Sequence, residues 1–308
     1  MARIIIFDSW KKFTEPIAEH WKSLGHQVIF NPQWEAMLEA DLSFFYQADN
    51  TAIEGVTKPH TGRVFIQCVD IEVWAGQASA VDWTKVDGAI FMAKHIKDIV
   101  NVGSTPWKLI KPGIDTNKFT LKTKVNDTPV RRIAYVVGDR RIWDVKRLDI
   151  AFQVLKDLMI SGQQIWQLHI RGTYSSHEQY NSYCKYLEKD LKLEGHVFWY
   201  PNRVDDMNTW LEDKDYFLLP STKEAFSYAT AEAMSKGIKP IINDWEGSKD
   251  NWAPFVCETQ GQMLFEFLKG KYEPEIYRQY VIDNFNQDRY FAELDNFILK
   301  GGDSRGIF

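Results

Sequence analysis

The chain has 308 residues, 44% of them hydrophobic, and a net charge of −5 from 37 basic and 42 acidic residues. These values are ordinary for globular proteins, so they exclude a disordered or fibrous chain, and the length suffices for two domains. They also exclude a chain-wide basic surface for nucleic acid, although not a local one. No apolar run reaches the roughly 20 residues of a membrane-spanning helix.

Cysteine and aromatic usage add two expectations. The three cysteines are widely spaced, and the first residues are typical of a strand rather than a signal peptide, so we expect a cytoplasmic protein without disulfides. Aromatic residues are abundant, with 12 Trp, 13 Tyr and 19 Phe. They can fill a core or form stacking platforms for sugars and bases, and composition leaves both interpretations open.

The first hundred residues alternate short apolar runs with stretches of helical periodicity. This rhythm is typical of βαβ units around a buried parallel sheet. The predicted strands are 3–7, 26–30, 42–46, 64–69 and 88–92, and the first predicted helix covers 13–24.

A polar stretch that contains Pro129 and lacks apolar periodicity follows. Such composition is typical of an interdomain linker. We therefore expect an N-terminal domain over 1–120, a linker over 121–130 and a second domain over 131–280.

The alternation restarts after the linker. The predicted strands are 132–138, 166–170, 196–200, 216–219 and 238–243, and the predicted helices are 148–161, 178–191, 206–211, 225–236 and 272–299. Two βαβ domains in tandem predict a cleft that holds a ligand at the carboxyl ends of the strands.

A basic loop follows the first strand of the second domain and precedes a helix. It begins at Gly138 and contains Arg140, Arg141, Lys146 and Arg147. Cations beside a helix N-terminus suit a phosphate or diphosphate, and a solvated basic loop is the alternative.

Two carboxylates, Glu224 and Glu232, lie eight residues apart at a predicted helix start, where Ser221 or Thr222 could be the cap. Eight helical residues span about 12 Å, which is too far for two carboxylates to act on one atom. The spacing matches an extended ligand such as a nucleotide-sugar, and a helix cap plus an exposed glutamate is the alternative. Farther along, Gly247 would let a phosphate approach the backbone.

Together these segments resemble the donor-binding domain of retaining GT-B glycosyltransferases of family 4. The resemblance rests on the Gly138 loop, on Pro220-Ser221 after a strand, on the E-x7-E spacing of Glu224 and Glu232, and on the Glu-Ala-Met-x-x-Gly run ending at Gly237. It is strong over about 110–250 and thin over 1–105.

The resemblance implies an α/β protein of the GT-B fold, with two Rossmann-like domains facing a central cleft. The first domain would bind the acceptor and the second the donor. The last segment, 281–308, would be a helix that crosses back to the N-terminal domain, followed by a loose tail. The implied activity is a retaining, metal-independent hexosyl or pentosyl transfer to a glycan, lipid-linked or small-molecule hydroxyl.

The resemblance also implies residue roles. Lys146 and Arg141, with Arg140 as a competing candidate, would neutralise the donor diphosphate, and Glu224 would contact the donor sugar. Glu232 would bind the ribose. Phe226 and Ser227 would contact the donor through their backbone N–H groups. The remaining implied donor-binding residues are Gly138, Gly247 and Ser248. The resemblance implies no metal ion, because Arg and Lys would take its role at the diphosphate. It also implies no cofactor, because a nucleotide-sugar such as a UDP- or GDP-sugar is a co-substrate.

The acceptor side departs from the family, since Val69-Asp70 replaces its His-Asp pair, while Ser227 stands where glycine is common. We take Asp70, Glu72, Trp10 and Trp74 as candidates for acceptor contacts. Two alternatives stay open: transfer to modified DNA bases, and a nucleotide-sugar binding protein without transfer activity. Residues 1–120 carry 12 basic and 14 acidic side chains, which disfavours the first.

Overall fold

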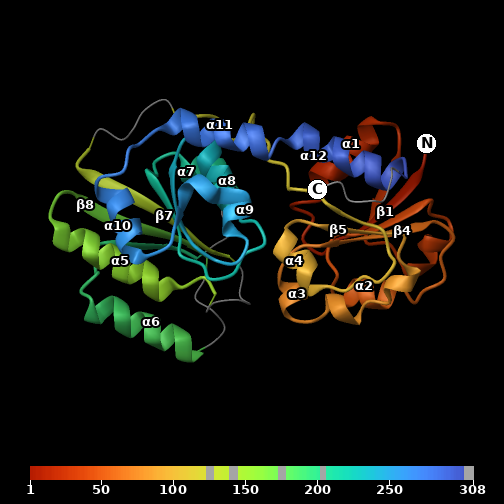
Figure 1. Cartoon of the computed structure of the whole chain (residues 1–308), viewed down its shortest axis with the longest axis horizontal. Helices are drawn as coiled ribbons and strands as arrows, with labels where there is room; N and C mark the ends of the chain where they lie inside the picture. The colour runs from red at the N-terminus through yellow and green to blue at the C-terminus, as the bar shows by residue number, and fades with distance from the viewer. Residues whose placement is uncertain (123–127, 139–144, 173–177, 202–205, 302–308) are drawn as a thin grey trace. The chain divides into compact units, whose positions relative to one another are not determined.

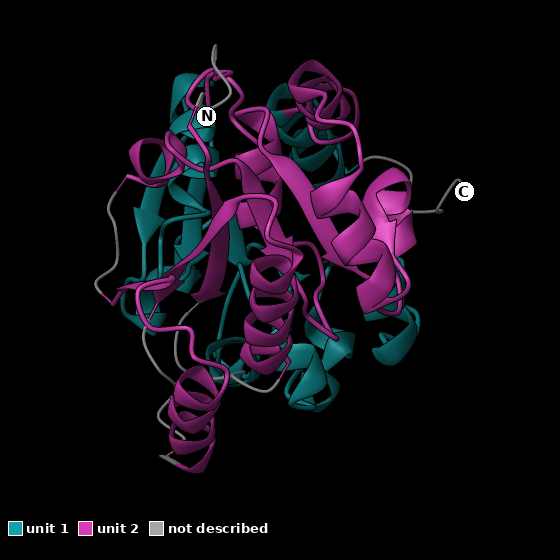
Figure 2. Ribbon diagram, turned by 90° about the vertical axis from the view of Figure 1, so that its left-hand side faces the viewer, with its two compact units in different colours: residues 1–113, 287–308 teal, residues 114–286 magenta. Residues whose placement is uncertain are grey.

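The computed structural model describes residues 1–122, 128–138, 145–172, 178–201 and 206–301. The chain forms two compact units (Figures 1 and 2): residues 1–113 with 287–308 make unit 1, and residues 114–286 make unit 2. Each unit contains a six-stranded parallel sheet covered by helices. The prediction of an α/β protein with two Rossmann-like βαβ units is therefore confirmed.

Unit 1 has the strand order β2-β1-β3-β4-β5-β6. Its buried strands are predominantly apolar, as a sheet covered on both faces requires, although Ser43 and Gln67 are also buried. The strands are β1 (Arg3–Phe7), β2 (Gln27–Phe30), β3 (Leu42–Phe45), β4 (Arg63–Cys68), β5 (Gly88–Phe91) and β6 (Trp107–Leu109). The helices are α1 (Glu15–Ser23), α2 (Asn50–Gly55), α3 (Ile71–Trp74), α4 (Lys94–Ile99) and α12 (Gln287–Leu294), with 3-10 turns at Trp34–Leu38, Ala78–Ala80 and Trp83–Lys85.

The C-terminal helix α12 and the π-helical turn Asp295–Leu299 complete the core of unit 1. Leu294 and Ile298 are fully buried among strand residues such as Phe44 and Phe65. Figure 1 shows α1 and α12 on one face of this sheet and α2, α3 and α4 on the other. The described part of the chain's end is thus part of the N-terminal unit, as expected from the GT-B resemblance.

Unit 2 has the strand order β12-β11-β10-β7-β8-β9, with α5, α6 and α10 covering one face. The strands are β7 (Val130–Gly138), β8 (Ile165–Gly172), β9 (Val197–Tyr200), β10 (Tyr216–Leu219), β11 (Lys239–Asn243) and β12 (Val256–Cys257). The helices are α5 (Leu148–Ser161), α6 (Glu178–Asp190), α7 (Met207–Leu211), α8 (Tyr228–Ser235), α9 (Ser248–Trp252), α10 (Gln260–Leu268) and α11 (Pro274–Asn284), with a 3-10 turn at Ala253–Phe255.

The chain passes between the units at two places that lie side by side. The N–H of Ile114 donates to the carbonyl of Phe285 at 2.9 Å, and Ile114 forms an isolated parallel bridge with Asn286. Gly113 needs to be a glycine because a Cβ there would lie 2.7 Å from the Cα of Gln287.

The boundary between the units therefore differs from the expected linker at 121–130. Residues 114–120 already belong to unit 2, and Lys122 is anchored in it through its ammonium, which donates to the carbonyl of Lys214 at 2.6 Å. Residues 123–127 lie outside the described part of the chain. The polar stretch belongs to unit 2, and composition alone does not distinguish a segment within a domain from a link between domains.

Two predicted helices differ from the observed ones by more than two residues or in their continuity. The helix expected over 225–236 begins only at Tyr228, and the helix expected over 272–299 is divided into α11, α12 and the π-helical turn. The break between α11 and α12 coincides with the passage of the chain from unit 2 to unit 1. The three cysteines are buried free thiols. In the part of the chain that the structure describes, no helix is long and apolar enough to cross a membrane.

Candidate active site

The neighbouring strands β7 and β10 define a topological switch point in unit 2. From β7 the chain moves outward through β8 and β9, and it then returns to β10 on the other side of β7. The connections that follow β7 and β10 therefore leave the sheet in opposite directions, which opens the crevice where ligands bind in such folds. Lys146 belongs to the first connection and Glu224 to the second.

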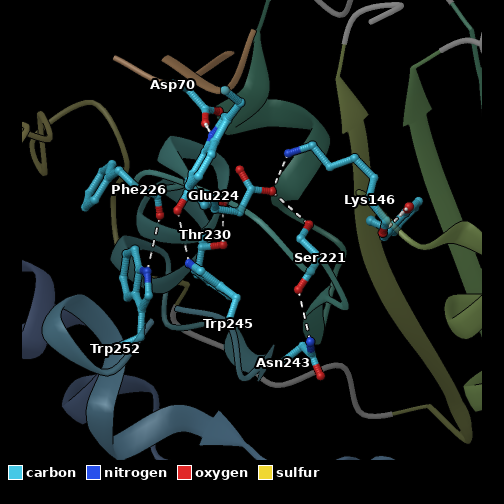
Figure 3. Close-up of polar contacts among 12 residues, drawn as sticks. Asp70, Lys146, Ser221, Glu224, Phe226, Thr230, Asn243, Trp245 and Trp252 are labelled. Atoms are coloured by element: carbon cyan, nitrogen blue, oxygen red, sulfur yellow. Dashed lines mark hydrogen bonds and ion pairs between the residues drawn. The ribbon is translucent and has the colours of Figure 1, made fainter. Parts of the chain in front are cut away.

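Lys146, Glu224 and Ser221 form one polar cluster at this point (Figure 3). The Lys146 ammonium forms an ion pair with Oε1 of Glu224, and the Ser221 hydroxyl donates to the same oxygen at 2.8 Å. The Glu224 side chain is 5% exposed and the Lys146 side chain 20%. A buried carboxylate with a cation and a hydroxyl as partners is held in one geometry.

Backbone contacts fix both connections. The hydroxyl of Tyr135, a buried residue of β7, donates to the Lys146 carbonyl at 2.9 Å. The N–H of Thr222 donates to the Val145 carbonyl at 2.8 Å, which ties the two connections together. The Asn243 amide donates to the Ser221 carbonyl at 3.0 Å, so β11 also supports the cluster (Figure 3).

The loop before α8 corrects the sequence prediction for Glu224. Glu224 lies four residues before the first helical residue, and Ser227 is the N-cap, in place of the expected Ser221 or Thr222. Ser227 has φ 80° and ψ 79°, a left-handed conformation that favours glycine. A glycine, which the family resemblance leads one to expect here, would adopt this conformation without strain. Glu232 is buried one turn inside α8 rather than two.

Gly247 and Ser248 form a tight turn after β11. Gly247 has φ 87° and precedes α9. The Ser248 hydroxyl donates to Oδ1 of Asp244 at 2.7 Å, and this hydrogen bond, aided by Lys249, lowers the pKa of the Asp244 carboxyl. Ser248 is 1% exposed, so its side chain shapes the turn itself.

The other predicted residues of the basic loop are placed only in part. Gly138 is the last residue of β7 and pairs with Gly172 of β8. Arg140 and Arg141 lie outside the described residues, so their diphosphate role stays a prediction.

In unit 1, three acceptor-side candidates share one helical turn. The Trp74 indole N–H donates to Oδ1 of Asp70 at 2.8 Å, and the Trp74 ring stacks on His95. Glu72 is 1% exposed, and its carboxylate accepts the N–H groups of Val69 and Asp70. Burial raises the pKa of Glu72. Glu72 therefore caps its own helix, which argues against a direct contact with an acceptor.

Trp10 follows β1, at the switch point between β1 and β3 of the unit 1 sheet. Trp10 is 41% exposed, and its backbone N–H donates to Oδ1 of the buried Asp8 at 2.8 Å. The Thr14 hydroxyl donates to the other oxygen of Asp8 at 2.6 Å. The loop is thus held from inside while it presents an aromatic ring at the surface.

Metal ligation has no obvious place in the described segments, where no three His, Cys, Asp or Glu side chains gather as ligands. Asp8 and Glu72 use their oxygens on neighbouring hydroxyl and backbone donors instead.

The comparisons with known proteins agree with this geometry. Residues 122–258 match the family of glycosyl transferases group 1. We call residues 122–258 the glycosyl transferases group 1 segment. The match confirms the resemblance deduced from the motifs over this segment, which contains the whole Lys146–Glu224–Ser221 cluster. Family 4 and the E-x7-E signature are consistent with the match and stay predictions. No curated protein matches the sequence.

Solved structures show that the whole chain has the GT-B fold. A glycosyltransferase from Rickettsia africae ESF-5 is 13% identical with a TM-score of 0.71, over 98% of this chain and 99% of that one. Anabaena HepE, in complex with UDP-glucose, is 13% identical with a TM-score of 0.73, over 97% and 100%. Sucrose-phosphate synthase from Thermosynechococcus elongatus is 12% identical with a TM-score of 0.74, over 97% and 99%. At these identities the likeness concerns the fold.

Four residues of the site were not assigned by the sequence. They come from β11 and the segment after it, and each donates a side-chain N–H to a carbonyl of the loop before α8: Asn243, Trp245, Asn251 and Trp252. The dense Asn and Trp content of 243–252 was the available signal, but a buried Trp is ordinarily core.

Proposed function

We propose that the protein is a retaining glycosyltransferase that moves a sugar from a nucleotide-sugar to an acceptor hydroxyl. The observation that carries the proposal is the Lys146–Glu224–Ser221 cluster at the switch point of the glycosyl transferases group 1 segment. Ligands bind beside such switch points in parallel sheets, and this one carries a cation and a buried carboxylate.

Lys146 has the chemistry to stabilise a leaving diphosphate. An ammonium group has three N–H donors, and Glu224 accepts one of them. In the proposed reaction the bond between the anomeric carbon and the phosphate oxygen breaks, and negative charge grows on the diphosphate. A fixed cation stabilises that charge more in the transition state than in the ground state. Arg141 or Arg140 would add a second cation.

Glu224 suits the donor sugar, since a carboxylate held by Lys146 and Ser221 accepts hydrogen bonds from sugar hydroxyls. The acceptor oxygen would attack the anomeric carbon from the face that the diphosphate leaves, and its proton would pass to the leaving phosphate. No metal ion takes part in this scheme, because Lys146 and an arginine of the same loop would neutralise the diphosphate.

The donor is tested by a thermal-shift screen of UDP-, GDP- and ADP-sugars, followed by donor hydrolysis. HepE binds UDP-glucose, so UDP-sugars are the first probes. A ligand at a hundredfold excess over its Kd stabilises the native state by about 2.7 kcal/mol, which raises the Tm by several degrees. Free sugars and the nucleotides alone are the controls. If no donor raises the Tm and none is hydrolysed, the proposal is wrong.

A further inference from the structure

Three consecutive carbonyl groups in the loop before α8 are each held by a side chain of the segment 245–252. All three donors are buried. The pairs are the Trp245 indole N–H on the Glu224 carbonyl at 3.0 Å, the Asn251 amide on the Ala225 carbonyl at 3.4 Å and the Trp252 indole N–H on the Phe226 carbonyl at 3.2 Å. Figure 3 shows the two indole contacts on one side of the loop and the Glu224 carboxylate turned toward Lys146.

These contacts determine where the N–H groups of the loop point. In a planar trans peptide the carbonyl and the following N–H point in opposite directions. The N–H groups of Ala225, Phe226 and Ser227 therefore point away from the segment that holds the carbonyls. Successive N–H groups aimed to one side form a site for the oxygen atoms of an anionic or polyhydroxyl ligand.

The loop also stores backbone strain. A non-glycine residue in the left-handed region is strained and persists only where its surroundings hold it. At Ser227 the surroundings are the Trp252 contact to the preceding carbonyl and a 2.8 Å hydrogen bond between the hydroxyls of Ser227 and Thr230. The ring of Phe226 stacks on Trp252 with centroids 5.3 Å apart.

We propose that Trp245, Asn251 and Trp252 are positioning residues of the donor site. They hold the peptide groups of 224–227 so that three N–H groups face the sugar or phosphate oxygens of the donor. This inference rests on the proposed function and adds to it the residues that build the donor loop.

A second buried tryptophan shows that the Trp252 contact is more than core packing. Trp166 lies in the core of unit 2 and is 1% exposed, against 0% for Trp252. Within the described part of the chain, the Trp166 indole nitrogen has no hydrogen-bond partner. Burial of an indole in this unit thus does not by itself bring a carbonyl to its N–H.

The test compares Trp252→Phe with Trp166→Phe, because both changes keep an aromatic ring and remove an indole. Hydrogen exchange of the segment 221–230 is measured first. We expect exchange at 225–227 to become at least tenfold faster in Trp252→Phe and to stay as in the wild type in Trp166→Phe. Trp245→Phe is the second variant, should Trp252→Phe fail to fold.

The affinity for the donor is measured next, with the nucleotide-sugar that stabilises the wild type and with its nucleotide alone. We expect Trp252→Phe to weaken binding of the nucleotide-sugar about tenfold and binding of the nucleotide less than threefold. Unchanged exchange at 225–227 overturns the inference, and so does faster exchange with unchanged donor binding. If the wild type binds no nucleotide-sugar, the proposed function fails first and the donor role of this loop fails with it.

Discussion

The two units each bury a glutamate just after a strand of a parallel sheet, and they satisfy it in different ways. In unit 1, Glu72 accepts backbone N–H groups within three residues of itself. In unit 2, Glu224 pairs with Lys146, which is 78 residues away in the sequence. A carboxylate satisfied by its own turn is a helix cap, whereas one held by a distant cation at a switch point has the features of a functional group.

The comparison also shows how each unit uses its tryptophans. Indole N–H groups donate in both units: those of Trp21 and Trp74 in unit 1 donate to carboxylates, that of Trp83 in unit 1 donates to a carbonyl, and those of Trp245 and Trp252 in unit 2 donate to carbonyls of another loop. The aromatic surplus therefore supplies hydrogen-bond donors as well as core volume. The stacking roles of Trp10 and Trp74 stay predictions.

The largest effect should follow from Lys146→Ala. The change removes the cation of the site, and a hydrogen bond to a charged group contributes about 1.5–3 kcal/mol, so we expect a 10- to 100-fold loss of donor affinity. Isothermal titration with the donor found in the screen measures it. Lys156→Ala, on helix α5, is the control, and near-normal affinity in Lys146→Ala would refute the site assignment.

The next effect distinguishes the two glutamates. Glu224→Gln keeps the size of the side chain and removes its charge, so we expect kcat for donor turnover to fall about tenfold or more while KM changes less than threefold. Glu72→Gln makes the same change in unit 1 and should leave donor hydrolysis as in the wild type. Equal losses of kcat in both variants would show that Glu72, as a helix cap, and Glu224, as a residue of the site, are wrongly distinguished.

A third prediction concerns the pH dependence of unit 2. Burial, aided by Lys214, lowers the pKa of His169 to about 4. Between its ordinary value of 6.5 and 4 the unfolded state binds a proton that the folded state does not, so stability falls as the pH falls through this window. Between pH 7.5 and pH 5 the free energy of unfolding should therefore fall by about 2 kcal/mol more in the wild type than in His169→Gln.

Urea unfolding at the two pH values measures this loss, and His60→Gln, a histidine of unit 1, is the control. A wild type and a His169→Gln variant with the same pH dependence would contradict the prediction.

The smallest effect should come from the titration of Glu72. Its contribution to stability changes with pH in the direction opposite to that of His169. Burial raises the pKa of its carboxyl above 4.5, so its contribution to stability is fully present below pH 4.5 and is lost as the pH rises through the raised pKa. The stability advantage of the wild type over Glu72→Gln should therefore shrink from pH 4 to pH 7. Urea unfolding measures it, with Glu35→Gln as the exposed control. An advantage that grows with pH would be inconsistent with a buried, charge-disfavouring site.

The βαβ alternation, most strand positions and the order of the motifs can be predicted from the sequence, because apolar periodicity and glycine stops are local properties. Helix 148–161 and strand 216–219 agree with the structure residue by residue. The family resemblance was readable for the same reason, since its motifs are short runs of adjacent residues.

Other features follow from the three-dimensional structure and could not be predicted from local sequence. The pairing of Lys146 with Glu224, the boundary at Gly113 rather than at 121–130, and the left-handed Ser227 all depend on contacts between distant segments. The loop before α8 stays out of the helix because side chains from 245–252 hold its carbonyls, and helical propensity, a weak preference, does not overcome those contacts.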